Sequence, residues 1–187
     1  MEIILASKSK RRIEMMDELG YPYRAVESGS NEVVDSSLSD DELVKELSKR
    51  KAMDVYKDNK NALVLGFDTL VFYDGKPIGK PKDKKECIKT IKTLSGNTHK
   101  VITGGFLKYK EKEVSFSSSC LVTFDNIPES VIIKYAETTE PYDKAGGYAV
   151  QGFIGRYISK VDGDIFTVIG MPKSIVNKLL FEFIQNN

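Results

Sequence analysis

The pattern of hydrophobic and polar residues predicts a protein built from both strands and helices. The longest apolar run lies near the middle, at Ala62 to Phe67, and is typical of a buried strand. The Asp74-Gly75 pair a few residues later is a hairpin-turn signal. Other stretches rich in β-branched and aromatic residues predict further strands. These are residues 2–6, 21–26, 100–110, 113–124, 148–161 and 165–169, of which 100–110 and 113–124 form a hairpin around Glu111-Lys112.

Helical periodicity and capping residues predict helices between these strands. Ser39 and Glu42 fit a capping box, and Asp83 with Glu86 is a similar start. Gly20 is well suited to end the first helix, because glycine readily adopts the left-handed conformation found there. The mixture of elements indicates an α/β fold with at least one antiparallel hairpin. The first helix is expected to follow Ser7-Lys8-Ser9 and to end at about Leu19. The others are expected from residue 39 to about 58, from 83 to about 94, from 128 to about 136, and from Pro172 onward.

Length and composition narrow the class of protein. The 187 residues suffice for one domain, or one domain with two lobes, and 41% hydrophobic with 29% charged residues is typical of a soluble globular protein. A formal net charge of +1 gives no general attraction to nucleic acid or anionic membranes. No apolar run approaches a membrane span, and the start lacks the features of a signal peptide. Cys87 and Cys120 have no metal-site spacing, so we expect a cytoplasmic protein.

The first candidate for chemistry is Asp68, which interrupts the central apolar strand. A two-residue period places it on the same face as Val64, Gly66 and Leu70. A carboxylate on an apolar face needs a partner, a metal ion or water. Several lysines follow closely, an arrangement suited to a site that handles metal and phosphate together. A structural ion pair followed by a solvated basic loop is the alternative interpretation.

A second candidate is the start of the first predicted helix. Its backbone N–H groups and helix dipole would favour an anion. Arg12 lies on the apolar stripe, Arg11 lies on a neighbouring face, and two arginines there would bind phosphate in bidentate fashion. Surface arginines without a ligand are the alternative. In the second helix Lys51 falls inside the buried arc, which indicates an anionic partner or a side chain reaching out to solvent.

Four separated motifs occur in order along the chain. They are LASKSKRR from Leu5, GFDTLVFYDGKPIGKPKD from Gly66, LSGNTHKVITG from Leu94 and EPYDKAGGYAVQG from Glu140. Together they resemble one known family, the Maf-type nucleoside triphosphate pyrophosphatases, and the resemblance covers Leu5 to Pro172. Lys10 replaces a usual proline, and Asn31-Glu32 stands where the family has Asp-Glu.

The resemblance implies a fold and a reaction. The fold is a two-lobed, elongated mixed β-sheet flanked by helices, Maf/ITPase-like, with a central cleft within one domain over residues 1–187. The reaction is hydrolysis of a nucleoside triphosphate between the α and β phosphates, which gives the monophosphate and pyrophosphate. The family also implies a divalent metal cation, Mg²⁺ or Mn²⁺, and a homodimer.

The resemblance assigns roles to residues that the patterns also select. Asp68 corresponds to the family's general base and could equally be a metal ligand, with Glu32 as a second carboxylate facing the metal. The residues expected to bind phosphate are Ser7, Arg12, Lys51 and Lys80. His99, the only histidine, is expected to form a structural hydrogen bond rather than take part in catalysis.

Base selectivity is also implied. The dTTP/UTP branch of the family combines residues that correspond here to Arg11, Thr69 and Gln151, whereas the branch acting on 7-methyl-GTP carries a late glutamate. A neutral amide such as Gln151 can both donate to and accept from a pyrimidine edge. We therefore expect canonical and modified pyrimidine triphosphates as substrates. A nucleotide-binding regulator of cell division, without turnover, is the alternative.

Overall fold

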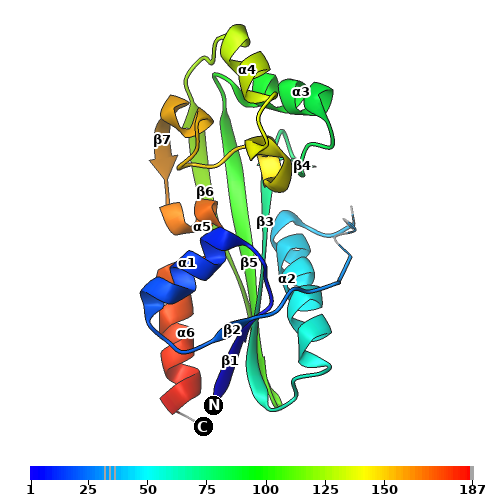
Figure 1. Cartoon of the computed structure of the whole chain (residues 1–187), viewed down its shortest axis with the longest axis vertical. Helices are drawn as coiled ribbons and strands as arrows, with labels where there is room; N and C mark the ends of the chain where they lie inside the picture. The colour runs from blue at the N-terminus through cyan, green and yellow to red at the C-terminus, as the bar shows by residue number, and fades with distance from the viewer. Residues whose placement is uncertain (32, 34, 36, 186–187) are drawn as a thin grey trace. The chain divides into compact units, whose positions relative to one another are not determined.

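The computed structural model describes residues 1–31, 33, 35 and 37–185 (Figure 1). Most predicted elements are confirmed. The first part of the chain contains β1 Glu2–Leu5, α1 Lys10–Leu19, β2 Arg24–Ala25, α2 Asp40–Tyr56, β3 Ala62–Tyr73, β4 Lys76–Ile78, α3 Lys84–Leu94 and β5 Thr98–Tyr109. The second part contains β6 Lys112–Phe124, α4 Glu129–Tyr135, the 3₁₀ helices η1 Glu140–Asp143, η2 Ala145–Gly147 and η3 Ile154–Tyr157, then β7 Ile158–Asp162, α5 Ile165–Ile169 and α6 Lys173–Gln185.

The strands form a mixed sheet, as expected for the α/β class. Among the described residues the strand order is β2-β1-β3-β5-β6-β7, with β4 paired to β3. β1 is parallel to both β2 and β3, whereas β3–β4 and β6–β7 are antiparallel. The β3–β4 turn places Asp74 and Gly75 at φ 51° and 66°, the left-handed pair that a tight hairpin requires.

The chain forms two compact units. One consists of Met1–Asp68, Thr103–Ser118 and Ile169–Asn187, and the other of Thr69–Ile102 and Ser119–Val168. Strands β3, β5 and β6 contribute residues to both. The boundary in β3 falls between Asp68 and Thr69, two of the candidate site residues.

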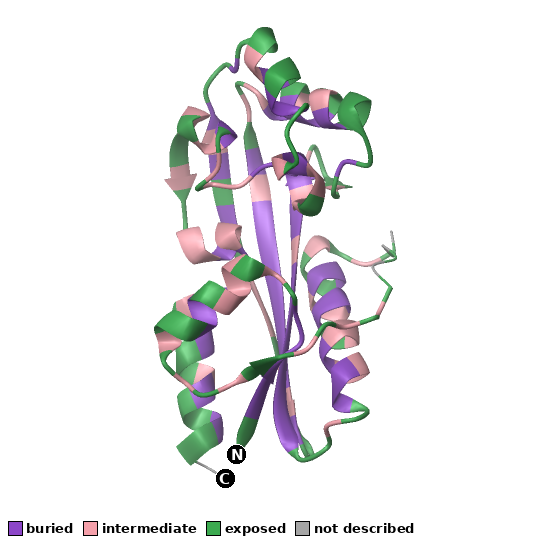
Figure 2. Ribbon diagram, viewed as in Figure 1, coloured by how far each residue is buried: buried purple, intermediate pink, exposed green. Residues whose placement is uncertain are grey.

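Each unit has its own hydrophobic core. In the first, α2 packs on β1 and β3 through a buried cluster that includes Ile4, Val55 and Val64. In the second, α3 and α4 cover strands through a cluster that includes Ile91 and Val122. Figure 2 shows β3 buried along most of its length, which explains why its sequence is apolar on both faces. Within the described part of the chain, no helix combines the length and hydropathy that a membrane span needs.

The helix boundaries follow the predicted capping residues. The Ser39 hydroxyl accepts from the Glu42 N–H while the Glu42 carboxylate accepts from the Ser39 N–H, which completes the capping box. The Asp83 side chain accepts from the Glu86 N–H and starts α3. Gly20, at φ 75°, ends α1. Short polar side chains therefore set where the helices begin, as the sequence predicts.

One strand prediction is only partly right and another is wrong. Of residues 148–161, only 158–161 lie in a strand, β7, whereas residues 148–157 form a turn and η3, because the chain folds back tightly at glycines. A Cβ on Gly155 would lie 1.9 Å from the Val150 carbonyl oxygen. Residues 165–169 form α5, because the Asp164 side chain accepts a hydrogen bond (2.9 Å) from the Phe166 N–H and caps the turn.

Candidate active site

Asp68 and Lys51 form an ion pair, as the sequence allowed. Asp68 lies in β3 and is 5% exposed. Lys51 comes from α2, and its ammonium group donates a hydrogen bond to Oδ1 of Asp68. The lysine side chain is only 14% exposed, so the pair is largely shielded from solvent. Its electrostatic interaction is therefore screened much less than that of a surface pair.

Two glycines bring α2 against the sheet and so place Lys51 beside Asp68. A Cβ on Gly66 would lie 2.4 Å from the Ser48 carbonyl oxygen, and one on Gly104 would lie 2.2 Å from the Val44 carbonyl oxygen. Helix backbone thus occupies the space that strand side chains would fill. The sequence alone does not assign this role to Gly66. The available signal is a glycine inside an apolar strand, two residues before the Asp68 carboxylate.

Ser7 lies at the same end of the β1–β3 pair as Asp68. The strands are parallel with Leu5 opposite Leu65, and the Ala6 N–H donates to the Leu65 carbonyl (2.7 Å). Ser7 is 8% exposed, and its hydroxyl accepts a hydrogen bond (3.1 Å) from the Ser9 N–H. This local turn leads into α1.

The two arginines of α1 are both partly buried. Nε of Arg12 donates to the Gly170 carbonyl (2.9 Å), so this side chain ties α1 to the segment that precedes α6. Figure 1 shows α1 and α6 side by side. Arg12 therefore has a structural contact in addition to its predicted role toward phosphate. Arg11 stays a prediction for substrate binding.

Three candidate residues belong to the second unit. Thr69 is partly buried in β3, whereas Lys80 and Gln151 are exposed. The turn that carries Lys80 is fixed by a hydrogen bond (3.0 Å) from the Gly146 N–H to the Gly79 carbonyl. Gln151 follows a few residues after Gly146, in the turn before η3. The structure therefore connects the Lys80 turn with the segment leading to Gln151.

The predicted metal site has one described carboxylate. Glu32 lies outside the described residues. Elsewhere in the described chain, no group of three or more His, Cys, Asp and Glu side chains is placed to hold a metal. Mg²⁺ is commonly bound by one or two carboxylates together with substrate phosphates. A single buried carboxylate at Asp68 fits that mode of binding.

His99 is structural, as predicted. It is 2% exposed, and its Nε2 lies 2.6 Å from the Tyr148 hydroxyl oxygen, while its ring packs against Phe124 and Tyr148. Nδ1 is buried and has no hydrogen-bond partner within the described residues. Burial lowers the pKa of His99 to about 4, so the imidazole is neutral at pH 7.

The arrangement of strands and helices matches a known fold. The structure of the Staphylococcus aureus Ham1 protein superimposes with a TM-score of 0.53 over 97% of this chain and 99% of that one, at 12% sequence identity. At this identity the likeness concerns the fold alone. It defines the chain as an α/β protein with the Ham1 type of architecture.

Sequence comparison identifies the family. The Maf-like protein family model matches residues 2–183, and the chain belongs to this family. A Bacillus pumilus protein named dTTP/UTP pyrophosphatase is 41% identical over 182 residues, which cover 97% of this chain and 96% of that protein. A Thermosipho africanus protein of the same name is 39% identical over 185 residues, which cover 97% and 93%. These relatives span almost the whole chain, so the expected family is confirmed.

Proposed function

We propose that this protein hydrolyses dTTP, UTP and modified pyrimidine nucleoside triphosphates to the monophosphate and pyrophosphate. The observation that carries the proposal is the shielded Lys51–Asp68 pair, in a chain about 40% identical to proteins named dTTP/UTP pyrophosphatase. This activity would remove unwanted nucleotides from the pool. The enzyme is a hydrolase acting on an acid anhydride.

The reaction consumes one water molecule. The water oxygen forms a bond to the α-phosphorus, the bond from that phosphorus to the α–β bridging oxygen breaks, and pyrophosphate leaves with the electron pair. Asp68 can serve as the base that takes the proton of the water, or it would be a ligand of a bound divalent cation. Lys51 donates a hydrogen bond to Oδ1 of this carboxylate and so orients it for either role.

Positive charge around the phosphates comes from the chain itself. Lys51, Arg12 and Lys80 would stabilise the charge that develops on the leaving pyrophosphate, and Ser7 would add a hydroxyl donor. A divalent cation, Mg²⁺ or Mn²⁺, would be held by Asp68 with Glu32 and substrate phosphate oxygens. When bound, it would neutralise phosphate charge and acidify a bound water molecule.

Base selectivity is proposed to depend on Gln151, with Arg11 and Thr69. Gln151 is exposed, so its amide is accessible to a bound substrate. An amide can pair with both donor and acceptor positions of a pyrimidine. We further propose a cytoplasmic homodimer that binds neither nucleic acid nor membrane. Light scattering of the purified protein would measure the oligomeric state.

The alternative, a nucleotide-binding regulator of cell division without turnover, is not favoured. Such a protein could use the arginines and lysines but would not need a shielded carboxylate on a strand face. The relatives that match almost the whole chain carry the names of enzymes. Turnover therefore accounts for more of the observations than binding alone.

Pyrophosphate release from a panel of nucleoside triphosphates, with Mg²⁺, with Mn²⁺ and with EDTA, tests the proposal. UTP and dTTP should be the best substrates, and EDTA should abolish turnover. Asp68→Asn should lower kcat by about 10²–10⁴, the usual contribution of a general acid or base. The exposed Asp58→Asn is the matched control and should leave kcat unchanged. Binding without pyrophosphate release by the wild-type protein would overturn the proposal.

A further inference from the structure

The segment that carries Gln151 is a tight turn with defined backbone contacts. The Gly152 N–H donates to the Ala149 carbonyl (3.0 Å), and the Gly155 N–H donates to the Gly152 carbonyl (3.1 Å). A side chain at Gly155 would collide with the Val150 carbonyl oxygen. Gln151 itself is exposed at the tip. The position of Gln151 therefore depends on the contacts that hold the two ends of this turn.

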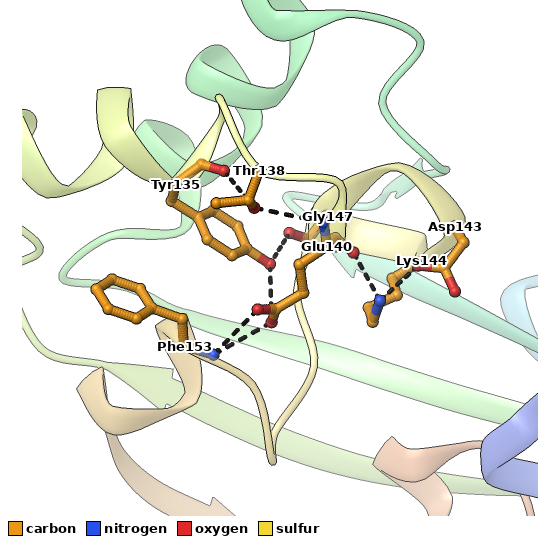
Figure 3. Close-up of polar contacts among 7 residues, drawn as sticks. All are labelled: Tyr135, Thr138, Glu140, Asp143, Lys144, Gly147 and Phe153. Carbon is orange, nitrogen blue, oxygen red and sulfur yellow. Dashed lines mark hydrogen bonds and ion pairs between the residues drawn. The ribbon is translucent and has the colours of Figure 1, made fainter.

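Glu140 holds the C-terminal end of this turn, at Phe153. Its two carboxylate oxygens accept hydrogen bonds from the Phe153 backbone N–H, at 3.2 and 3.3 Å (Figure 3). A Cβ at Gly152 would lie 1.8 Å from Oε1 of Glu140, so the carboxylate occupies space that only a glycine leaves open. The Phe153 ring is also held, because it stacks on Tyr135 (6.3 Å, 15°) and lies under the Arg156 guanidinium (4.0 Å).

Tyr135 holds the N-terminal end of the segment, at Gly147. Its buried hydroxyl donates to the Gly147 carbonyl (3.0 Å) and also reaches Oε1 of Glu140 at 3.3 Å. Burial and then the Glu140 charge raise the pKa of Tyr135 well above its usual value, so the hydroxyl keeps its proton. Tyr135, at the end of α4, thus contacts Gly147, where the segment starts. It also contacts the Glu140 carboxylate, which holds the other end at Phe153.

Glu140 is anchored by its own backbone. Its N–H donates to the Thr138 hydroxyl (3.3 Å), and its carbonyl accepts from the Lys144 ammonium group (2.6 Å). The Thr138 hydroxyl donates in turn to the Tyr135 carbonyl (2.8 Å). Figure 3 shows these contacts as one connected network. Side chains in such a network hold each other in place better than isolated pairs do.

We infer that Tyr135 and Glu140 form a clasp that positions the 147–153 segment and, through Gln151, sets selectivity for pyrimidine nucleoside triphosphates. Both are positioning residues, because they contact the segment and act on the substrate through it. The inference rests on the proposed function of Gln151. It predicts a specificity effect at two residues to which the sequence motifs assign no role toward the base.

The experiment compares Glu140→Gln, Tyr135→Phe and Gln151→Ala with wild type, using UTP, dTTP, CTP and GTP. Each clasp variant should raise KM for UTP and dTTP about tenfold, the equivalent of one misplaced hydrogen bond. Its kcat should change less than twofold, and the ratio of kcat/KM for UTP to kcat/KM for GTP should fall. Glu137→Gln, an exposed acid paired with Lys84, is the matched control and should match wild type.

The double variant Glu140→Gln/Gln151→Ala separates positioning from general stability. If Glu140 acts through Gln151, the double variant should be no worse than Gln151→Ala alone. Amide hydrogen exchange should show faster exchange at residue 153 in Glu140→Gln. If the losses of kcat/KM in the two single variants add in the double variant, the clasp is overturned. An unchanged substrate ranking in an active and folded Glu140→Gln variant would also overturn it. Either result would leave the proposed function intact. A wild-type protein that releases pyrophosphate from no triphosphate would instead overturn the proposed function, and the clasp's effect on selectivity with it.

Discussion

Lys51 on α2 donates a hydrogen bond to Asp68 on β3, and both side chains are largely buried. A buried ion pair is costly to form, and removal of one partner leaves an uncompensated charge. Once the pair is formed, the stability of the first unit depends on keeping both partners, and so does the proposed chemistry.

Replacement of Lys51 by Met should lower the free energy of unfolding by about 3 kcal/mol, because Asp68 would stay buried without its partner. The double variant Lys51→Met/Asp68→Asn should recover part of this loss. Urea denaturation measures both. Lys57→Met removes a pair between more exposed side chains, with Asp54, and should cost under about 0.5 kcal/mol. Equal effects of the two lysine replacements would contradict a shielded pair.

Replacement of Gly66 by Ala should destabilise the protein by about 1–3 kcal/mol, the usual range for an overpacked core. The new methyl group meets the Ser48 carbonyl, so α2 must move away from β3 and carry Lys51 with it. Pyrophosphate release should fall in parallel. Gly29→Ala is the control, because its Cβ would lie 3.8 Å from the nearest atom, in ordinary contact. A neutral Gly66→Ala variant would show that α2 is not held this closely.

The buried His99 predicts a loss of stability in acid. Its pKa of about 4 in the folded protein is below the ordinary histidine value of 6.5, so the unfolded chain binds the proton more readily between these values. Stability from this group is complete above pH 6.5 and is lost as pH falls toward 4. The loss between pH 7 and pH 5 should be about 2 kcal/mol. Urea denaturation of His99→Gln should show a smaller difference between these pH values, and an unchanged difference would assign the effect to other groups.

Replacement of Gln151 by Glu should shift selectivity away from UTP. A carboxylate only accepts hydrogen bonds, whereas the amide also donates, so one of the contacts with a pyrimidine edge is lost. kcat/KM for UTP should fall about tenfold or more, as expected for a lost hydrogen bond at a substrate-reading site. The same measurement with GTP is the control. An unaltered ranking of substrates would count against base reading by Gln151.

Local signals predicted much of the fold. The Ser39 capping box, the Asp74-Gly75 hairpin and the Gly20 helix end all appear as the sequence indicates, because each depends on residues within a few positions. Residues 165–169 were predicted as a strand from their β-branched and aromatic content. The Asp164 side chain caps them as a helix instead, so one polar contact outweighs a weak preference.

Candidate site residues were predictable where a side chain breaks a pattern. Asp68 and Lys51 are charged residues at core positions, and they are partners in the structure. Glu140 gave no such signal, since it does not interrupt an apolar pattern in the sequence. Its contacts with Tyr135 and Phe153 join residues from separate elements, and no local pattern encodes them.

The packing of α2 on the backbone at Gly66 and Gly104 also bears on how the protein tolerates change. Elsewhere in a core, the spacing between a helix and a sheet follows the size of the side chains between them. Here main-chain atoms meet directly, so the spacing is independent of side-chain volume. Substitutions elsewhere in this core can therefore accumulate over generations while the distance from helix to strand at the ion pair stays constant.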